Sequence, residues 1–423
     1  MKSIKHIAVL SDHLRVLTGR GGGVDRCQWR LAREYARQGY TVDLVVLNDE
    51  GLEDIQFPDR ITLYALKRSS ALRAKATALA AAPAECLDMA RPVLLPLRPN
   101  GRLRFLNALS NYLLERQPDL LISAGTYENL ISVLAKRHAK TETALILSER
   151  NTLSQVLQHR GHDKSWRWRY LPPLLSKMYS QANAVIGVSS VVAKDLERTL
   201  DVPADKIHVT YNPVVDETLI RHASEPVNHP WLTQKKCPVL ISVGRMRAQK
   251  DYPTLLKAFK AAREQGPLRL IILGDGPERT ALEHVAQALG IADDVDMPGY
   301  EKNPYPFMAA ADALVLSSRW EGLPGVLIEA LACGCQIVST DCHGGSAEVL
   351  DHGRYGRLVP MEDPEEMARA IWLALEQPVP VDKILEGSKR FSVPVAAKNY
   401  LALVSRQEDH CDTTANEKAF NPL

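Results

Sequence analysis

Short apolar runs alternate with helix-length amphipathic patterns along the first half of the chain. Strands that alternate with helices imply a parallel sheet covered by helices on both faces. The predicted strands are 6–10, 41–47, 61–65, 119–123, 143–148, 183–188 and 207–211, and the predicted helices are 24–38, 101–116, 127–138 and 189–199. Residues 67–104 interrupt this rhythm with Ala, Pro and Arg, which indicates an insertion or a mobile segment.

A Pro- and His-containing stretch from Asn212 to Pro230 is typical of a linker, and a second alternating series follows it. Its predicted strands are 239–243, 268–273, 294–297, 313–317 and 336–340, and its predicted helices are 252–265, 277–289, 304–311, 324–332 and 364–376. The pattern therefore predicts two α/β domains, 1–215 and 216–391. A last helix near 392–407 is expected to pack back on the first domain, and 408–423 is predicted to be a loose polar tail.

Length and composition agree with two globular domains. The chain has 423 residues, of which 45% are hydrophobic and 24% charged, and a single core rarely grows to that size. The apolar run Ile7–Leu10 is too short for a signal peptide, and no later run approaches the ~20 apolar residues of a spanning helix. These features predict a cytoplasmic protein.

The seven cysteines are scattered, without the regular spacing of a disulfide framework, and the single residue between Cys333 and Cys335 does not fit a zinc site.

Charge is divided unequally between the two halves. Residues 1–215 carry 30 Lys and Arg against 21 Asp and Glu, whereas the remainder carries 22 against 29. A basic aromatic cluster from Trp166 to Tyr170 suits either a membrane interface or rings packed into the domain with exposed cations. We expect reversible binding to anionic membrane surfaces, with that cluster and Arg98, Arg102 and Arg104 as contacts. Nucleic acid is not favoured, because no binding motif accompanies the basic excess.

A glycine-rich loop, with Gly19 and then Gly21, Gly22 and Gly23, precedes the first helix. A dinucleotide-binding loop requires the glycines to follow the first strand directly, but nine residues, 11–19, separate Leu10 from the first candidate turn beyond Gly19. Two interpretations remain: backbone N–H groups that approach an anion at a helix N-terminus, or an ordinary flexible loop.

Two cations follow the first strand of the second domain. Arg245 and Lys250 lie after 239–243, at the carboxyl edge of the predicted parallel sheet, where ligands of such sheets bind. Two fixed positive charges suit a diphosphate better than a monocarboxylate. Gly274 opens a tight turn at the same edge, between the next strand and its helix.

Two carboxylates lie on either side of a helix start in the same domain. Glu321 follows strand 313–317, and Glu329 lies about one and a half turns into the helix that starts at Pro324. One carboxylate at the helix mouth and one on the helix can reach different hydroxyl groups of one ligand. The spacing alone is weakly specific, but Gly322-Leu323-Pro324 and the later turn Gly344–Glu348 add to it.

These elements together resemble the donor site of the large retaining glycosyltransferase family 4. The likeness covers most of the chain and is densest from 239 to 360. Gly21–Arg26 resembles that family's N-terminal glycine loop, with Asp25 where a Glu is more usual. Where many relatives have a His after the fifth strand, this chain reads Ser148-Glu149-Arg150-Asn151, which resembles the subgroup that builds lipid-linked or surface polysaccharides.

The resemblance implies a GT-B fold, in which two Rossmann-like doubly wound domains face a cleft. It also implies transfer, with retention, of a hexose or N-acetylhexosamine from a nucleoside-diphosphate sugar, expected to be UDP-linked, to a saccharide acceptor that is expected to be lipid-linked. Arg245 and Lys250 would stabilise the departing phosphate, Glu321 would hold the transferred sugar, and Glu329 would bind ribose. No metal or cofactor is expected. Further candidate donor contacts are Gly22, Gly23, Gly274, Gly299, Leu323 and Pro324, and candidate acceptor or sugar contacts are Glu149, Arg150 and Asn151.

Three other interpretations stay open. A nucleotide-sugar epimerase of the same fold would convert the free donor without an acceptor, and a non-catalytic sugar-binding protein would have a degenerate donor site. An NAD oxidoreductase is disfavoured by the length of the glycine loop. Asp294-Val295-Asp296 mimics a metal-binding motif of the other glycosyltransferase fold, but its place before a strand favours a charged loop.

Overall fold

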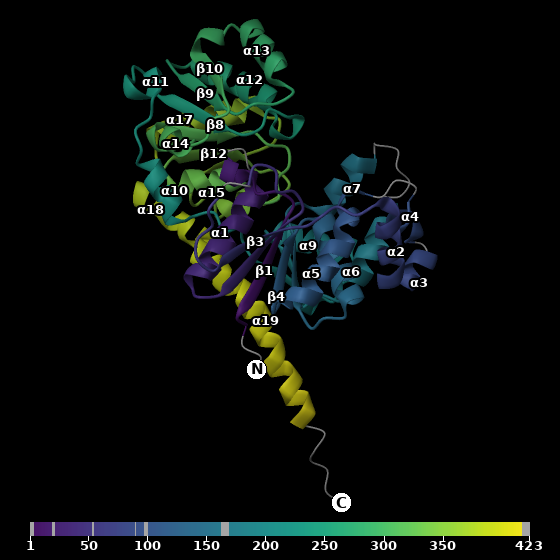
Figure 1. Ribbon diagram of the computed structural model, residues 1–423. Coiled ribbons are helices and arrows are strands. Elements are labelled where there is room, and N and C mark those ends of the chain that lie inside the picture. The colour runs from purple at the N-terminus through teal and green to yellow at the C-terminus, as the bar shows by residue number, and fades with distance from the viewer. Residues whose placement is uncertain are drawn as a thin grey trace, which may run out of the picture. The chain divides into compact units, whose positions relative to one another are not determined.

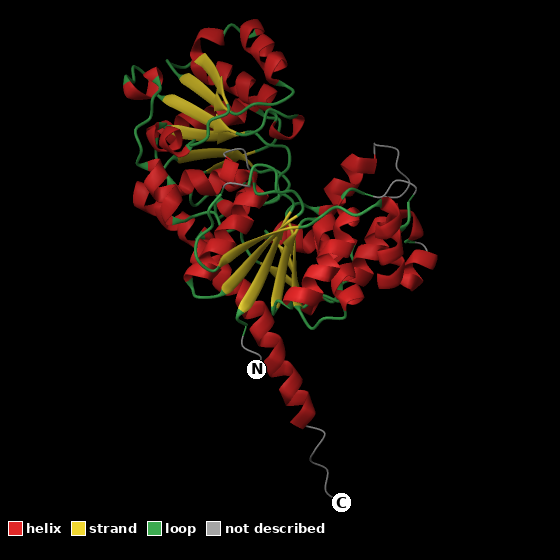
Figure 2. Ribbon diagram, in the orientation of Figure 1, coloured by secondary structure: helices red, strands yellow, loops and turns green. Residues whose placement is uncertain are grey.

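The computed structural model describes residues 4–18, 22–52, 55–88, 90–96, 100–161 and 169–416. The chain forms two compact units (Figure 1). Unit 1 comprises Met1–Pro213 together with Val393–Leu423, and unit 2 comprises Val214–Ser392. Each unit is a parallel sheet with helices on both faces (Figure 2), so the predicted pair of Rossmann-like domains is confirmed.

Unit 1 contains a seven-stranded parallel sheet in the order β3-β2-β1-β4-β5-β6-β7. The chain order reverses between β1 and β4, which places the topological switch point of the sheet there. The predicted strands differ from the observed ones by at most two residues at either end. The strands are β1 (His6–Ser11), β2 (Thr41–Val46), β3 (Ile61–Ala65), β4 (Leu120–Ala124), β5 (Ala144–Glu149), β6 (Ala184–Gly187) and β7 (Ile207–Val209).

The helices of unit 1 include several that the sequence pattern does not predict. Those that were predicted are α1 (Gly23–Arg37), α5 (Leu106–Arg116), α6 (Thr126–Ala139) and α9 (Ser190–Thr199). The others are α7 (Leu153–Gly161), α8 (Leu171–Tyr179), α2 (Ala71–Ala81), α3 (Pro83–Leu87) and α4 (Arg91–Leu94). The described part of 67–104 is therefore a small helical subdomain, and α2 packs on α5 and α6 through small side chains such as Ala74 and Ala78.

The last helix, α19 (Val393–Asn416), belongs to unit 1 and lies against α1. The hydroxyl of Tyr35, on α1, donates to the backbone oxygen of Ala397, on α19, at 3.3 Å. Tyr35 is fully buried, and so is Tyr400 of α19. Residues 408–416, which were predicted to begin a loose tail, are helical as part of α19, and the looseness of this stretch stays a prediction. Residues 408–416 contain no Gly or Pro that would interrupt the helix.

Unit 2 contains a six-stranded parallel sheet in the order β10-β9-β8-β11-β12-β13, with its switch point between β8 and β11. Its strands are β8 (Val239–Val243), β9 (Arg269–Leu273), β10 (Val295–Gly299), β11 (Ala313–Leu316), β12 (Gln336–Thr340) and β13 (Arg357–Val359). Its main helices are α12 (Tyr252–Arg263), α13 (Arg279–Ala288), α14 (Tyr305–Ala310), α15 (Gly325–Ala332), α17 (Pro364–Glu376) and α18 (Val381–Ser388).

The stretch expected to be a linker is partly helical. It contains α10 (Glu217–Ala223), which packs against α14, and it ends at α11 (Pro230–Thr233). The Asp216 side chain caps α10 by accepting from the Leu219 N–H at 2.8 Å. The boundary between the units therefore falls at Pro213, and unit 2 begins directly after it.

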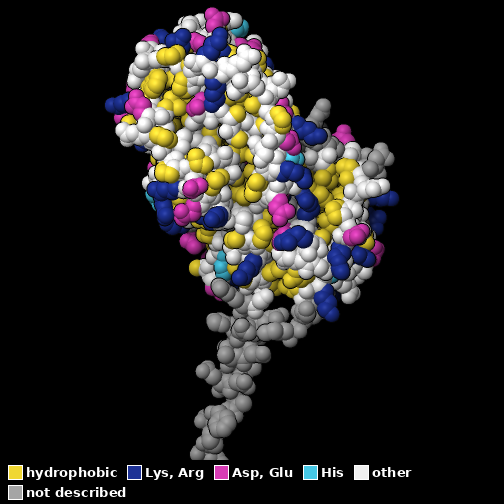
Figure 3. Space-filling model, turned by 90° about the vertical axis from the view of Figure 1, so that its left-hand side faces the viewer, with side chains coloured by type: hydrophobic (Ala, Val, Ile, Leu, Met, Phe, Trp, Pro, Cys, Tyr) yellow, Lys and Arg dark blue, Asp and Glu magenta, His cyan; other side chains and the backbone are white. Residues whose placement is uncertain are grey.

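Within the described residues, no helix combines the length and the apolar character that crossing a membrane requires. On the face that Figure 3 shows, Lys and Arg side chains lie among Asp and Glu side chains over much of the surface.

Candidate active site

Two loops at the switch point of unit 2 are bonded to each other. The loop after β8 runs from Gly244 to Asp251, and the loop after β11 runs from Ser317 to Pro324. The Ser317 hydroxyl donates to the backbone oxygen of Lys250 at 2.7 Å, and the Gln249 side-chain amide donates to the Trp320 oxygen at 2.9 Å. These bonds fix the two loops that carry the predicted cations and the first predicted carboxylate.

Lys250 and Glu321 form a direct ion pair at this edge. The Lys250 Nζ lies 2.6 Å from the Glu321 Oε1, and the Ser318 hydroxyl donates to the same oxygen at 2.8 Å. Their side chains are only 16% and 11% exposed, so solvent screens the pair weakly. The resemblance seen in the sequence assigns Lys250 to the phosphate and Glu321 to the transferred sugar, whereas the structure places the two side chains in contact with each other.

Arg245 differs from Lys250 because its side chain is exposed to solvent. Its loop is shaped by Gly274, which has a φ of +139° and an N–H that donates to the Gly299 oxygen at 2.7 Å. A Cβ at Gly274 would lie 2.0 Å from the Gly244 oxygen. Gly274 and Gly299 therefore act on the site by allowing the loops after β8, β9 and β10 to approach one another.

Glu329 lies in the second turn of α15 and is 9% exposed. It accepts a hydrogen bond from the Tyr305 hydroxyl at 3.3 Å. Pro324 occupies the N-cap position of α15, and Leu323 beside it is buried. Tyr305, on α14, is a partner that the sequence gives no local signal for.

The Gly344–Gly345 turn packs against the loop that holds Glu321. Gly344 has a φ of +138°, and a Cβ there would lie 1.8 Å from the Glu321 oxygen. The Glu321 N–H donates to the His343 oxygen at 2.9 Å. Glycine is required here because the two backbones touch, so this turn positions the Glu321 loop.

In unit 1, the N-terminus of α1 already has an anionic partner. The Gly22 N–H donates to the Asp25 carboxylate at 3.4 Å, in a capping box. Burial raises the pKa of Asp25. Gly21 lies outside the described residues. A phosphate at Gly22 would have to compete with this carboxylate, so the roles of Gly22 and Gly23 stay predictions.

Glu149, at the carboxyl end of β5, is a buried carboxyl with three donors. Tyr179 donates to it, Thr126 does so at 3.1 Å and the Asn129 amide at 3.3 Å. Burial raises the pKa of Glu149 to about 7, against the opposing effect of these donors. The residue is only 3% exposed, so Glu149 stabilises the end of β5 and offers little surface to a ligand.

Arg150 follows and is 8% exposed. Its guanidinium donates to the side-chain oxygens of Asn212 and, at 3.4 Å, of Gln28. Its Nε has no hydrogen-bond partner among the described residues. Asn151 is exposed. The guanidinium thus links the end of β5 to α1 and to the segment before Pro213.

A second cluster at the carboxyl edge of unit 1 was not predicted as a unit. Arg102 pairs with Asp12, after β1, and with Glu128, on α6, at 3.0 Å. The His13 Nε2 lies 3.5 Å from the Asp12 carboxylate. Arg102 was expected to contact a membrane; its guanidinium is held by these two carboxylates while its side chain stays 43% exposed, so that expectation stays a prediction.

The acidic motif before β10 has structural partners. The Arg263 Nε lies 2.9 Å from the Asp294 carboxylate, and the His229 Nε2 lies 2.9 Å from that of Asp296. In the part of the chain that the structure describes, no three His, Cys, Asp or Glu side chains are grouped so that they could hold a metal ion.

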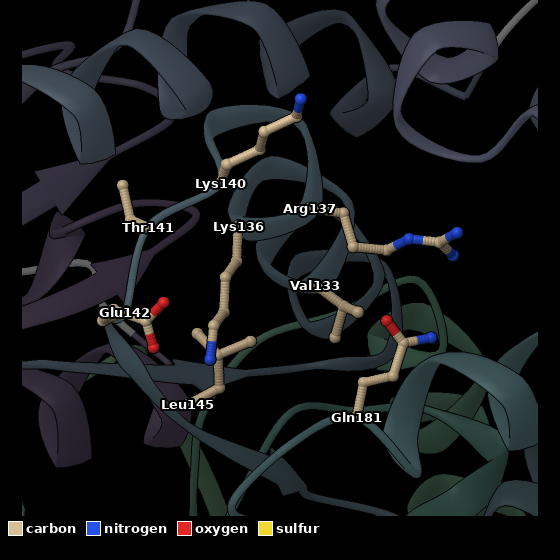
Figure 4. A pocket seen from close by; sticks show the side chains of 8 residues that line it. All are labelled: Val133, Lys136, Arg137, Lys140, Thr141, Glu142, Leu145 and Gln181. Carbon is tan, nitrogen blue, oxygen red and sulfur yellow. The ribbon is translucent and has the colours of Figure 1, made fainter.

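An open pocket of about 290 Å³ lies elsewhere in unit 1, at the amino end of β5 (Figure 4). Lys136 and Glu142 point into the same space, whereas Lys140 and Arg137 point away from it. Arg137 is paired with Glu85 at 3.0 Å. The carboxyl ends of the strands carry the candidate site, so this pocket is separate from it.

Comparison with known proteins places the two units in one class of protein. Residues 21–218 match the family described as Glycosyltransferase Family 4, and residues 227–391 match that described as Glycosyl transferases group 1. The chain therefore belongs to the GT-B glycosyltransferases of the family 4 type.

Several relatives are similar in sequence to parts of this chain. An N-acetylgalactosamine-N,N'-diacetylbacillosaminyl-diphospho-undecaprenol 4-alpha-N-acetylgalactosaminyltransferase of Campylobacter jejuni is 28% identical over 59% of this chain and 64% of its own length. The lipopolysaccharide 1,6-galactosyltransferase of Escherichia coli K12 is 26% identical over 61% of this chain and 66% of its own. The match thus spans less than two thirds of either relative.

Solved structures share the fold along nearly the whole chain. The crystal structure of Anabaena HepE in complex with UDP has a TM-score of 0.70 at 20% identity, over 95% of this chain and 100% of that one. The outer-core galactosyltransferase WaaB has a TM-score of 0.65 at 20% identity, over 95% and 99%.

Proposed function

We propose that this protein is a retaining glycosyltransferase that moves a hexose or N-acetylhexosamine from a nucleoside-diphosphate sugar, UDP-linked, to a saccharide acceptor. The observation that carries the proposal is the Lys250–Glu321 pair at the switch point of unit 2. It places a cation and a carboxylate where ligands of such sheets bind, with Arg245 exposed on the same loop.

The proposed reaction separates positive from negative charge, and the side chains at the site carry charges that suit both. As the bond between the anomeric carbon and the diphosphate breaks, negative charge grows on the leaving phosphate and positive charge on the sugar ring. Lys250 and Arg245 stabilise the phosphate. Glu321 accepts from hydroxyl groups of the sugar once Lys250 turns to the phosphate, and Glu329 accepts from the ribose hydroxyls.

Retention fits a reaction on one face of the sugar. The departing phosphate oxygen takes the acceptor's proton while the acceptor oxygen bonds the anomeric carbon on the face that the phosphate leaves. Glu149, Arg150 and Asn151 are proposed to contact the acceptor or the far side of the sugar. Burial of Glu149 and Arg150 makes Asn151, which is exposed, the most accessible of the three.

The acceptor is proposed to be lipid-linked, in surface polysaccharide or lipopolysaccharide synthesis, at the inner face of the cell membrane. The names of the Campylobacter jejuni and Escherichia coli relatives support this class of acceptor, because they specify a diphospho-undecaprenol carrier and lipopolysaccharide.

The test begins with the donor. Calorimetry with UDP-glucose, UDP-galactose and their N-acetylated counterparts identifies the sugar, and proton NMR of the product identifies its anomeric configuration. Lys250→Ala is compared with Lys257→Ala, an exposed lysine on α12. An inverted product rejects retention. Conversion of the free donor without an acceptor identifies an epimerase, and binding without turnover identifies a sugar-binding protein.

A further inference from the structure

The helical subdomain of unit 1 exposes large apolar side chains. Leu72 and Leu79, on α2, are 78% and 42% exposed, and Leu87, at the end of α3, is 81% exposed. We call these three side chains the leucine face. None of the three is among the residues that were predicted to contact a membrane. Of those, Arg98 and Trp166 to Trp168 lie outside the described residues, and Arg104 donates to the Ser69 oxygen.

Helix α2 has two apolar sides, only one of which is packed. Successive helical residues are ~100° apart, so Ala74, Thr77, Ala78 and Ala81 share the side that is buried against the domain. Leu72, Ala76 and Leu79 share the opposite side, and all three are exposed. A helix that needs only one packed side would ordinarily carry polar residues on the other.

Cations flank this exposed side. On the same helical spacing, Arg73 and Lys75 lie on either side of the line from Leu72 to Leu79. Long basic side chains in such positions can bury their stems beside apolar surface and keep their charge at its edge. Lys67, Arg68 and Arg91, on the adjoining segments, are exposed as well.

The net charge of the subdomain is positive. Residues 67–104 contain eight Lys and Arg but only Glu85 and Asp88 as acids. Glu85 is buried and paired with Arg137, and Asp88 lies 3.8 Å from Lys177. Apolar side chains between cations match a surface of anionic headgroups over hydrocarbon.

We infer that the leucine face inserts into an anionic lipid surface, with Arg73 and Lys75 on the headgroups. The biological meaning of this contact rests on the proposed lipid-linked acceptor. The contact itself requires neither donor nor acceptor, so it can be tested without measuring transfer.

The experiment is flotation of the full chain with vesicles of equal parts phosphatidylglycerol and phosphatidylcholine. We expect Leu72→Gln/Leu79→Gln/Leu87→Gln to lower the partition coefficient at least 10-fold. The matched control, Ile220→Gln/Leu373→Gln/Leu385→Gln, changes exposed apolar residues of unit 2 and should float like the wild type. Thermal melting checks that both triple variants fold.

A second arm tests the charges. Arg73→Gln/Lys75→Gln should weaken flotation, and the control Lys257→Gln/Lys260→Gln, on α12, should not. Salt of about 1 M should weaken wild-type binding, because the screening length falls to ~3 Å.

Three outcomes overturn the inference: no wild-type flotation, equal flotation of the leucine variant, or equal binding to pure phosphatidylcholine. Light scattering that shows a wild-type dimer, and a monomeric leucine variant, would instead assign the face to a second copy of the chain. Flotation without transfer activity would reject the proposed function and leave the inference standing.

Discussion

The buried carboxyl of Glu149 should make the stability of unit 1 depend on pH. Burial raises its pKa from 4.5 to about 7 in the folded chain. Between these two values the unfolded chain loses the proton while the folded chain keeps it. Glu149 therefore stabilises the fold fully below pH 4.5, and this contribution is lost as the pH rises through about 7.

The magnitude follows from the difference between the two pKa values. At about 1.4 kcal/mol for each pH unit, the loss between pH 4.5 and pH 7 is about 3 kcal/mol. Glu149→Gln cannot ionise and keeps an oxygen that can accept from Asn129 or Tyr179. Relative to the wild type, the variant should gain about 3 kcal/mol in free energy of unfolding between pH 4.5 and pH 8.

The assay is hydrogen–deuterium exchange of peptides from β4 and β5, with variant and wild type compared at each pH. The comparison at equal pH cancels the intrinsic dependence of exchange on pH. Glu115→Gln, an exposed acid on α5, is the control and should show no such trend. A difference between Glu149→Gln and wild type that stays constant with pH, or that changes in the opposite direction, would refute the reasoning.

Three further predictions concern the donor site. Lys250→Ala and Arg245→Ala should each lower turnover by a factor on the order of 100, measured by steady-state kinetics, and wild-type turnover would reject their roles. Glu329→Gln should weaken UDP binding in calorimetry more than Glu321→Gln, which should chiefly lower turnover; equal losses of UDP affinity would contradict this division. Gly344→Ala should lose several kcal/mol in free energy of unfolding, seen as a lower urea midpoint, or fail to fold, because its Cβ would lie 1.8 Å from a backbone oxygen; an unchanged urea midpoint would show that the turn can shift.

The sequence predicts the sheets well because a buried parallel strand reads as an uninterrupted apolar run. The missed strand β13 has only three residues, and one of them is Arg357. The missed helix α8 begins with Leu171-Pro172-Pro173, which reads as a break, although prolines are tolerated in the first turn of a helix. Helix α2 is rich in alanine on both sides, and α3 and α4 have only five and four residues, so no amphipathic period distinguishes these helices.

The candidate site was predictable only as separate residues. Sequence order places Lys250 and Glu321 after strands of one sheet, but their contact, across 71 positions, depends on β8 and β11 being neighbours. The three donors to Glu149 come from α6 and α8, and no local pattern connects them to β5. Arg102 reads as a surface cation until its two carboxylate partners are seen.

The return of α19 to unit 1 affects how the chain can fold during synthesis. Unit 2 is one continuous segment, whereas unit 1 lacks the partner of Tyr35 until Ala397 has been made, 362 residues later. The first 213 residues must therefore wait, with the side of α1 that α19 covers left open, while the whole of unit 2 is synthesised. A released chain that ends at Ser392 should hold a finished unit 2 and an incomplete unit 1, the reverse of the N-terminal-first order usual for multidomain chains.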